Sequence, residues 1–243
     1  MEIMKLFDAK NKKLWDWKIP TIVFFGDSVT QGCFEFYMKS ERELQTVFDK
    51  EHAFHNYIAK IFNLLYPEVP VNIINAGISG SDAVRSLKRI ERDVLSYSPD
   101  LTVVSFGLND SFGGEEGIKV YCDALRTMFE KISQSGSEII FMTQNMMNTQ
   151  VSCNIKEPYA RELAEKTAKI QNEGMLGMYF DAAKKVAAEY GVKVCDLHAK
   201  WKKLYENGVN ITELLANNIN HPKRELNWLS AYSLVETMMD MNV

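Results

Sequence analysis

Residues 21–32 read TIVFFGDSVTQG, and the character of the chain changes abruptly at Gly26. Residues 22–25 form an unbroken apolar run, which is typical of a strand covered on both faces of a parallel sheet. Gly-Asp-Ser follows directly, where the chain leaves the strand. Ligands of open α/β sheets bind in the crevice at the carboxyl ends of the strands. Ser28 is therefore either the cap of a helix or a group that takes part in chemistry at that edge.

Similar apolar runs alternate with helix-like segments along the rest of the chain. Strand-like runs lie at residues 21–25, 71–75, 101–106, 138–143 and 192–197. Segments with helical periodicity lie at residues 52–66, 82–97, 117–133 and 179–191, and a last one begins near Pro222. This alternation is typical of parallel βαβ units. It predicts an α/β fold, a three-layer α/β/α sandwich with a central parallel sheet.

Two segments fit the alternation less well. Residues 144–160 have no clear period and are predicted to form a long loop near the strand ends, where loops often carry function. LWDWKI, residues 14–19, is a candidate for a short edge strand that docks two tryptophans onto the sheet. No repeat, low-complexity tract or Pro/Gly-rich linker divides the chain. We therefore expect residues 1–243 to form a single domain, with residues 1–20 as an extension at its edge.

Composition and charge exclude several classes of protein. The 243 residues are 46% hydrophobic and 25% charged, which is ordinary for a soluble globular domain, and the formal net charge is −4. No broad basic field is implied, so nucleic acid and anionic membranes are not expected partners. No apolar run approaches the roughly 18 residues of a membrane span, and the N-terminus lacks the pattern of a signal peptide. We expect a cytoplasmic protein, unless a leader has been trimmed from this sequence.

The cysteines and histidines do not suggest a metal site. The four cysteines, Cys33, Cys122, Cys153 and Cys195, lie far apart and form no C-x-x-C pair. Free thiols are expected, and a structural zinc site is not. The i,i+3 pair His52 and His55 is weak support for a metal by itself.

Polar motifs follow three of the predicted strands, and another lies near the C-terminus. GDSVTQG contains Ser28, NAGISG contains Gly77, GLND contains Asn109, and NNINHP contains His221. Taken singly, Ser28 would most often be a helix N-cap, and Gly77 a turn residue. Asn109 would be part of a turn pair, and His221 a helix-entry residue before Pro222.

Taken together, these residues supply the parts of an acyl-transfer site. Serine is a poor nucleophile until a base removes its proton, and histidine is the usual base near neutral pH. Amides at strand-to-helix turns and an asparagine side chain can donate hydrogen bonds to the developing oxyanion. One parallel sheet would present Ser28, Gly77 and Asn109 along the same edge. GDSVTQG matches neither the G-x-S-x-G nucleophile elbow nor a nucleotide-binding loop.

The motifs and their order resemble those of the SGNH (GDSL) hydrolase family. FFGDSVTQG resembles the block that carries the nucleophile, here Ser28, and NAGISG resembles the block whose glycine, here Gly77, offers a backbone amide. GLND resembles the block whose asparagine, here Asn109, offers its side-chain amide, and HP matches the block of the histidine base, here His221. The resemblance covers most of the chain and implies a flavodoxin-like SGNH hydrolase fold. It also implies hydrolysis of carboxylic esters with no metal or organic cofactor.

The last block departs from the family pattern Asp-x-x-His. Asn218 stands three residues before His221, in the place of the family's aspartate. An asparagine cannot stabilise an imidazolium as a carboxylate does, and in serine proteases such a change lowers kcat by about 10⁴-fold. Three interpretations remain open: a Ser28–His221 dyad with a backbone carbonyl on the second ring N–H, another carboxylate that reaches the histidine, or a weak or inactive enzyme. We favour the dyad.

Neighbouring acids and the other histidines are assigned structural roles. Asp27 and Asp110 lie beside the candidate residues, and a buried aspartate next to a nucleophile would hinder its activation unless hydrogen bonds neutralise it. We expect both to organise their turns through bonds from side chain to backbone. His52, His55 and His198 are expected to be packing residues.

The predicted activity is that of a serine carboxylester hydrolase that works through an acyl-enzyme. Ser28 would attack the carbonyl, His221 would move the proton, and Ser28, Gly77 and Asn109 would form the oxyanion hole. The expected partner is a small ester, either an acylated sugar or a lipid ester. A short acyl group such as acetyl is favoured because no long apolar lid or membrane-binding helix is evident. The alternatives are a thioesterase or lysophospholipase on the same fold, and a non-catalytic ligand-binding module.

Overall fold

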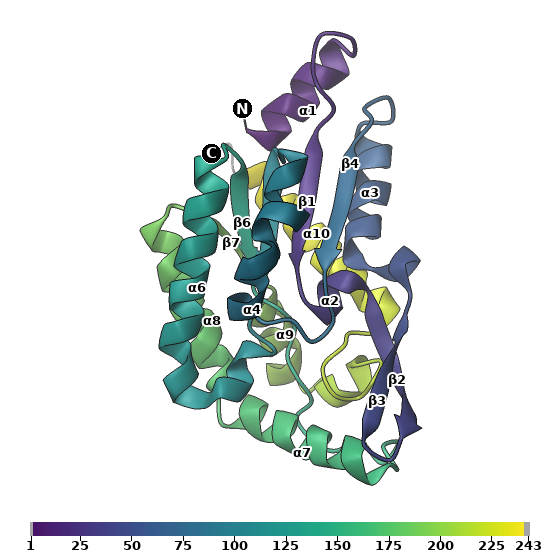
Figure 1. The fold of residues 1–243 in the computed structure, drawn as a ribbon. Coiled ribbons are helices and arrows are strands. Elements are labelled where there is room, and N and C mark those ends of the chain that lie inside the picture. Colours follow the sequence, from purple (N-terminus) through teal and green to yellow (C-terminus); the bar gives the residue numbers. More distant parts are fainter. Residues whose placement is uncertain (1, 241–243) are drawn as a thin grey trace.

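A five-stranded parallel sheet lies at the centre of the protein (Figure 1). The computed structural model describes residues 2–240. The strands are β1 (Thr21–Gly26), β4 (Asn72–Gly77), β5 (Leu101–Ser105), β6 (Glu138–Met142) and β7 (Lys193–Cys195), in the order β4-β1-β5-β6-β7. All four pairings are parallel. Counted along the sheet's own strands, this is the 2-1-3-4-5 order of flavodoxin-like folds, so the predicted three-layer α/β/α sandwich is confirmed.

Helices cover both faces of this sheet (Figure 1). One face packs against α1 (Ile3–Lys12), α3 (Phe54–Leu65), α9 (Leu197–Glu206) and α10 (Asn227–Met239). The other packs against α4 (Ala83–Ser86), α5 (Ile90–Asp93), α6 (Gly114–Gln134) and α8 (Met175–Glu189). Short 3₁₀ turns lie at Lys50–His52, Leu87–Arg89, Leu95–Tyr97, Asp110–Gly113, Ile211–Leu214 and Arg224–Leu226.

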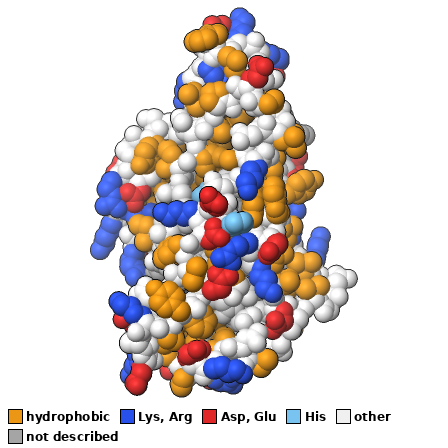
Figure 2. Space-filling model, turned by 90° about the vertical axis from the view of Figure 1, so that its right-hand side faces the viewer, with side chains coloured by type: hydrophobic (Ala, Val, Ile, Leu, Met, Phe, Trp, Pro, Cys, Tyr) orange, Lys and Arg blue, Asp and Glu red, His pale blue; other side chains and the backbone are white. Residues whose placement is uncertain are grey.

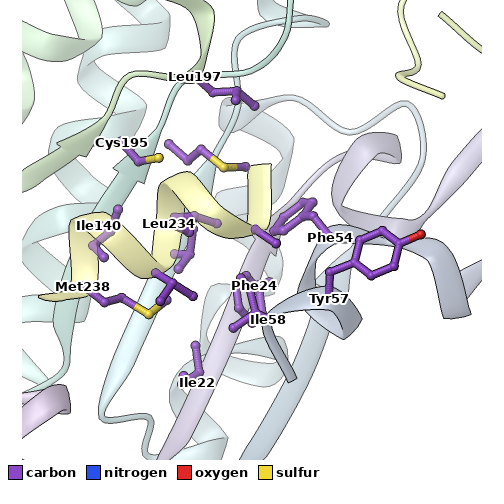
Figure 3. Packing of buried hydrophobic residues seen from close by; sticks show 14 of the residues in the cluster. Ile22, Phe24, Phe54, Tyr57, Ile58, Ile140, Cys195, Leu197, Leu234 and Met238 are labelled. Carbon is purple, nitrogen blue, oxygen red and sulfur yellow. The ribbon is translucent and has the colours of Figure 1, made fainter. Parts of the chain in front are cut away.

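The strand β1 sends side chains into both cores. Ile22 and Phe24 point to one face and Val23 and Phe25 to the other, as the alternation of a strand requires, and all four are fully buried. Figure 3 shows Phe24 between the sheet and α3, close to Phe54, and the two ring centroids are 5.6 Å apart. Complete burial of one such side chain contributes about 1.5–3 kcal/mol. These two cores explain why β1 is apolar without a break.

The carboxyl ends of the strands meet α2 (Ser28–Gln31), a hairpin and α7 (Pro158–Asn172) (Figure 1). The hairpin consists of β2 (Cys33–Ser40) and β3 (Glu43–Phe48), an antiparallel pair separate from the central sheet. Its residues are mostly half-buried or exposed, so no apolar run marks it in the sequence. Neither the hairpin nor helices α7 and α9 were predicted, and the predicted helix at 82–97 is broken into short turns.

The N-terminal region also differs from the prediction, because residues 14–19 form no strand. Trp15 is 98% exposed and does not dock onto the sheet. The preceding residues instead form α1, whose buried side chains are Ile3, Met4, Leu6, Phe7 and Lys10. Their spacing places them on one helical face. The ammonium group of Lys10 donates to the carbonyl oxygens of Leu14 and Trp17, which occupies the backbone that a strand would pair.

The surface carries charges of both signs. Figure 2 shows acidic and basic side chains interspersed over the face that it draws, with apolar side chains between them. No helix within residues 2–240 is long and apolar enough to cross a bilayer.

Candidate active site

The sequence motifs come together where the order of the strands reverses. From β1 the chain continues to β4 on one side of the sheet, and β5 then lies on the other side of β1. Gly26, the last residue of β1, pairs with Gly77 of β4 and with Ser105 of β5. Such a switch point opens a crevice at the strand ends, which is where ligands bind in this type of sheet. Ser28 and Asn109 follow the two strands that border the crevice.

Ser28 and His221 lie within hydrogen-bond distance in this crevice. His221 Nε2 is 3.0 Å from Ser28 Oγ, the distance expected of a nucleophile and its base. The serine is not needed as a helix cap, since Asp27 Oδ1 accepts the bond from Val29 N at 3.0 Å. Both residues are nearly buried, with 5% of Ser28 and 7% of His221 exposed. The Oγ is therefore free to take part in chemistry.

The second ring nitrogen of His221 bonds to a backbone carbonyl. Nδ1 lies 2.9 Å from the carbonyl oxygen of Phe34, near the start of β2. A carbonyl only accepts, so Nδ1 carries the hydrogen and Nε2 keeps the lone pair that can take a proton from Ser28. Burial lowers the pKa of His221 to about 4, opposed by the bond to Phe34 and the charge of Glu35. The ring is neutral at pH 7 and able to act as a base.

Asn218 does not contact the ring, in contrast to its predicted place in the last block. Its side-chain amide donates to the carbonyls of Thr212 at 3.1 Å and Leu215 at 3.3 Å, and its φ is 54°. Asparagine tolerates this left-handed conformation better than most residues. Within residues 2–240, neither ring nitrogen of His221 bonds to Asn218. The residue that shapes the loop is Asn217, and no sequence pattern singled it out.

Asn217 holds the loop by accepting three backbone bonds. Its Oδ1 receives the amides of Ile219, Asn220 and His221 at 2.9–3.0 Å. Its own amide donates to Asn220 Oδ1 at 2.9 Å. These bonds fix the backbone from which the imidazole projects.

The structure corrects one predicted oxyanion donor. The amide of Gly77 already donates to Asn75 Oδ1 at 2.9 Å. A Cβ at Gly77 would overlap the backbone nitrogen of Gln31, so the glycine permits close packing of α2 against β4. Gly80, in the same NAGISG motif, is exposed with φ +73°, and its amide makes no hydrogen bond within the described residues. Gly80 therefore replaces Gly77 as the candidate donor.

The other two predicted donors follow β1 and β5, the strands that border the crevice. Asn109 Nδ2 donates to the carbonyl of Ser81 at 2.8 Å, and its other contact, with Asp27 Oδ2, is long at 3.5 Å. The backbone amide of Ser28 has no acceptor in residues 2–240. The candidate donors to an oxyanion are thus the backbone N–H groups of Ser28 and Gly80 and the side-chain amide of Asn109, from three turns at the strand ends.

A buried carboxylate and a glutamine connect two of these turns. Asp27 Oδ2 accepts from Gln144 Nε2 at 2.9 Å, and Gln144 Oε1 accepts from Leu108 N at 2.9 Å. Burial raises the pKa of Asp27 to about 6, while its bonds to Gln144 and Val29 oppose the shift. The predicted turn-organising role of Asp27 is confirmed by its bond from Val29. Gln144 lies in the predicted 144–160 loop, but no motif marked it.

Asp110 was predicted to organise its own turn, but its side chain bonds to a neighbouring turn instead. Its Oδ1 accepts from Ala83 N at 2.9 Å, at the start of α4. Burial raises the pKa of Asp110 to about 7. Its contact with α4 helps to fix the segment next to Gly80 and Ser81.

The cysteines and remaining histidines do not reach the serine–histidine pair. All four cysteines are free, and burial raises the pKa of Cys33 to about 12. His52 pairs with Asp49 at 2.9 Å. Burial lowers the pKa of His55 and of His198 to about 4. No group of three or more His, Cys, Asp or Glu side chains in residues 2–240 is arranged to hold a metal ion.

Three cavities surround this end of the molecule. One of about 400 Å³ adjoins Asn109 and Asp110 and is also lined by Arg85 and Tyr121. One of about 560 Å³ lies between the hairpin tip and the start of α7. The largest, about 760 Å³, lies among the loop after β6, α8 and α9. Only the first borders a candidate oxyanion donor.

A serine against a neutral histidine, with grouped amides at the switch point of a parallel sheet, is the arrangement that acyl-transfer chemistry requires. The family model described as the GDSL-like lipase/acylhydrolase family matches residues 24–228. The chain belongs to this family, whose members hydrolyse ester bonds.

The chain is also similar to individual proteins whose activity is named. An acetylxylan esterase from Geobacillus stearothermophilus is 32% identical over 90 residues, and this match spans 37% of the chain and 39% of that protein. A solved structure of an acetylxylan esterase from the same organism has 19% identity and a TM-score of 0.66, covering 90% of this chain and 94% of the other. A gut microbial diltiazem-metabolizing enzyme has 20% identity and a TM-score of 0.67, covering 91% and 47%. These two structural likenesses show the fold.

Proposed function

We propose that this protein is a serine carboxylester hydrolase that removes a short acyl group, such as acetyl, from a carbohydrate through an acyl-enzyme. The observation that carries the proposal is the pair of bonds on one imidazole. Ser28 Oγ lies 3.0 Å from Nε2 of His221, and the carbonyl of Phe34 lies 2.9 Å from Nδ1. One bond joins nucleophile to base, and the other fixes the tautomer that the base needs.

The first half of the reaction forms the acyl-enzyme. Ser28 Oγ bonds to the acyl carbon while its proton passes to Nε2 of His221. The tetrahedral intermediate then collapses, and the bond to the alcohol oxygen breaks. That oxygen takes the proton from Nε2 and leaves as the free alcohol.

The second half returns the enzyme to its starting state. Water gives a proton to Nε2 of His221, and its oxygen bonds to the acyl carbon. The bond between that carbon and Ser28 Oγ breaks, and Oγ recovers the proton. The carboxylic acid leaves, so no net proton or electron is taken from the protein.

The negative oxygen of each intermediate would be held by amides. The backbone N–H groups of Ser28 and Gly80 are available, and Asn109 can turn the N–H of its long 3.5 Å contact with Asp27. Each such donor typically raises kcat by a factor of about 10²–10³. The imidazolium lacks a carboxylate partner, so we expect a slower enzyme than one with a complete triad.

The assignment of a small acylated carbohydrate rests on a relative. The cavity of about 400 Å³ that adjoins Asn109 is lined by neither Ser28 nor His221, so it does not identify the substrate. The relative with 32% identity is an acetylxylan esterase.

The test compares wild type with Ser28→Ala on p-nitrophenyl acetate, butyrate and octanoate, and on acetylated xylo-oligosaccharides. We expect the wild type to turn over acetate fastest, and the mutant to lose about 10⁴-fold or more of kcat. Its melting temperature should stay near that of wild type, because Asp27 caps α2. Equal rates for both proteins would refute the proposal and favour a non-catalytic binding module. Fastest turnover of octanoate or of a thioester would favour a lysophospholipase or a thioesterase.

A further inference from the structure

The carbonyl of Phe34, which accepts the bond from Nδ1 of His221, belongs to the β2–β3 hairpin. Phe34 is the second residue of β2, and the β2–β3 hairpin does not join the central sheet. A two-stranded hairpin is at best marginally stable on its own. The place of the Phe34 carbonyl therefore depends on what fastens the hairpin to the rest of the molecule.

Arg224, three residues after His221, binds the hairpin where β2 begins and where β3 ends. Its Nη1 and Nη2 donate to the two carboxylate oxygens of Glu35 at 2.5 and 3.0 Å, and its Nε donates to Asp49 Oδ2 at 2.7 Å. Glu35 follows Phe34 in β2, and Asp49 directly follows β3. The guanidinium also lies over the Phe34 ring, 4.3 Å from its centroid. One side chain thus joins the loop of the base to both strands of the hairpin.

The geometry of this cluster is more rigid than that of an ordinary surface ion pair. A bidentate bond between arginine and a carboxylate fixes the planes of both groups. The side chains of Arg224 and Asp49 are only 28% and 24% exposed. The bonds from Arg224 and then His52 lower the pKa of Asp49 to about 2, and the bond from Arg224 lowers the pKa of Glu35. The three groups remain charged at neutral pH and bound to one another.

We propose that Arg224 is a positioning residue that holds the Phe34 carbonyl against Nδ1 of His221, and so fixes the tautomer of the base without the carboxylate that the last motif lacks. The inference rests on the proposed function, because the ring that it positions is the base of that reaction. Arg224 itself touches no reacting atom. It acts through the hairpin, by fixing the acceptor that selects the tautomer of His221.

A matched control pair lies on the other side of the sheet. Arg126 of α6 makes a bidentate pair with Glu189 of α8 at 2.8 and 3.0 Å, and also bonds to Asp123 at 3.0 Å. Its side chain is 37% exposed, and it contacts neither the hairpin nor the loop of His221. Arg126→Met therefore removes the same kind of pair without touching the candidate site.

The experiment measures ester hydrolysis, histidine ring ¹⁵N NMR and melting temperature for wild type, Arg224→Met and Arg126→Met. We expect Arg224→Met to lower kcat by about 10²-fold with little change in KM, since displacement of a catalytic group by about 1 Å costs that much. The NMR of the same variant should show His221 losing its single Nδ1–H tautomer. The control should keep wild-type kcat and the wild-type ring signals.

A kcat for Arg224→Met within about twofold of the control, with an unchanged tautomer, would overturn the proposal even if the melting temperature fell. Should Arg224→Met fail to fold, Glu35→Gln is the milder variant, because Arg224 keeps its bond to Asp49. We expect Glu35→Gln to lose about tenfold in kcat and to shift the tautomer in the same direction. If the wild type itself hydrolyses no ester, the proposed function fails, and the NMR comparison alone decides the positioning role.

Discussion

Ser28 and His221 face each other, but they are held in place by different means. Ser28 follows β1, whose side chains at 22–25 are buried between two hydrophobic cores. His221 lies in a loop whose backbone is held by Asn217, by the bridge between Leu215 and Pro222, and by a bond from Asn145 Nδ2 to the carbonyl of Asn220. The strand before the nucleophile is held by apolar packing on both faces, whereas the loop of the base combines the burial of Leu215 and Ile219 with many polar contacts. A mutation that weakens polar contacts should therefore affect the base first.

After Ser28→Ala, the largest expected effect among the residues that follow the strands comes from Asn109→Ala. Loss of the side-chain amide removes one donor to the oxyanion, so we expect kcat to fall by about 10²–10³-fold with a small change in KM. Asn207→Ala is the control, because the Asn207 amide also bonds a carbonyl, that of Lys203, but lies on an exposed surface. Measurement of kcat and KM on p-nitrophenyl acetate checks the prediction. Wild-type kcat in Asn109→Ala would remove this residue from the mechanism.

Protonation of His221, the catalytic base in the loop, should be visible in the pH profile of kcat/KM. Burial lowers the pKa of His221 from 6.5 to about 4, so the ring loses its ability to accept a proton only when pH falls through about 4. We expect kcat/KM to be level above about pH 5 and to fall about tenfold one pH unit below the pKa. A midpoint near 6.5 would instead show a solvated imidazole.

Stability must be followed in the same experiment. His55 and His198 are also neutral when folded, with pKa values of about 4. Their unfolded pKa lies near 6.5, so the unfolded chain binds more protons below that pH, and stability is lost as pH falls from about 6.5 to 4. Recovery of full activity after return to pH 7 separates protonation of His221 from unfolding.

The smallest expected change in kcat comes from Asn218→Asp, although the family pattern has an aspartate at this position. The Asn218 amide donates to the carbonyls of Thr212 and Leu215, and a carboxylate in that place would face two acceptors. We expect kcat to rise by less than about threefold, and the free energy of unfolding to fall by about 1–3 kcal/mol, measured with urea. A rise in kcat by orders of magnitude would show that the native dyad is inadequate.

The strand-end half of the site was accessible from sequence, and the loop half was accessible only in part. An apolar run followed by GDS marks β1 and Ser28, because burial on both faces leaves a clear pattern. His221 was recognisable from the order of the motifs. The Phe34 carbonyl was not, since every residue has a carbonyl and only the fold selects one.

Other details needed three-dimensional contacts for the same reason. NAGISG contains two glycines, and only the bond from the Gly77 amide to Asn75 distinguishes the packing glycine from the candidate donor Gly80. Gln144 carries no motif, because its role consists of bonds to Asp27 and Leu108 from distant parts of the chain. The β2–β3 hairpin has no apolar run to mark it.

The paired glycines at the ends of β1 and β4 set the limits for redesign of this protein. Gly26 and Gly77 are in register, and a methyl group on either would overlap the short helix α2. Gly80 has open space around it. A mutant library aimed at a new substrate should therefore keep residues 26 and 77 invariant, because a side chain at either position would displace α2, the helix that begins with the nucleophile Ser28.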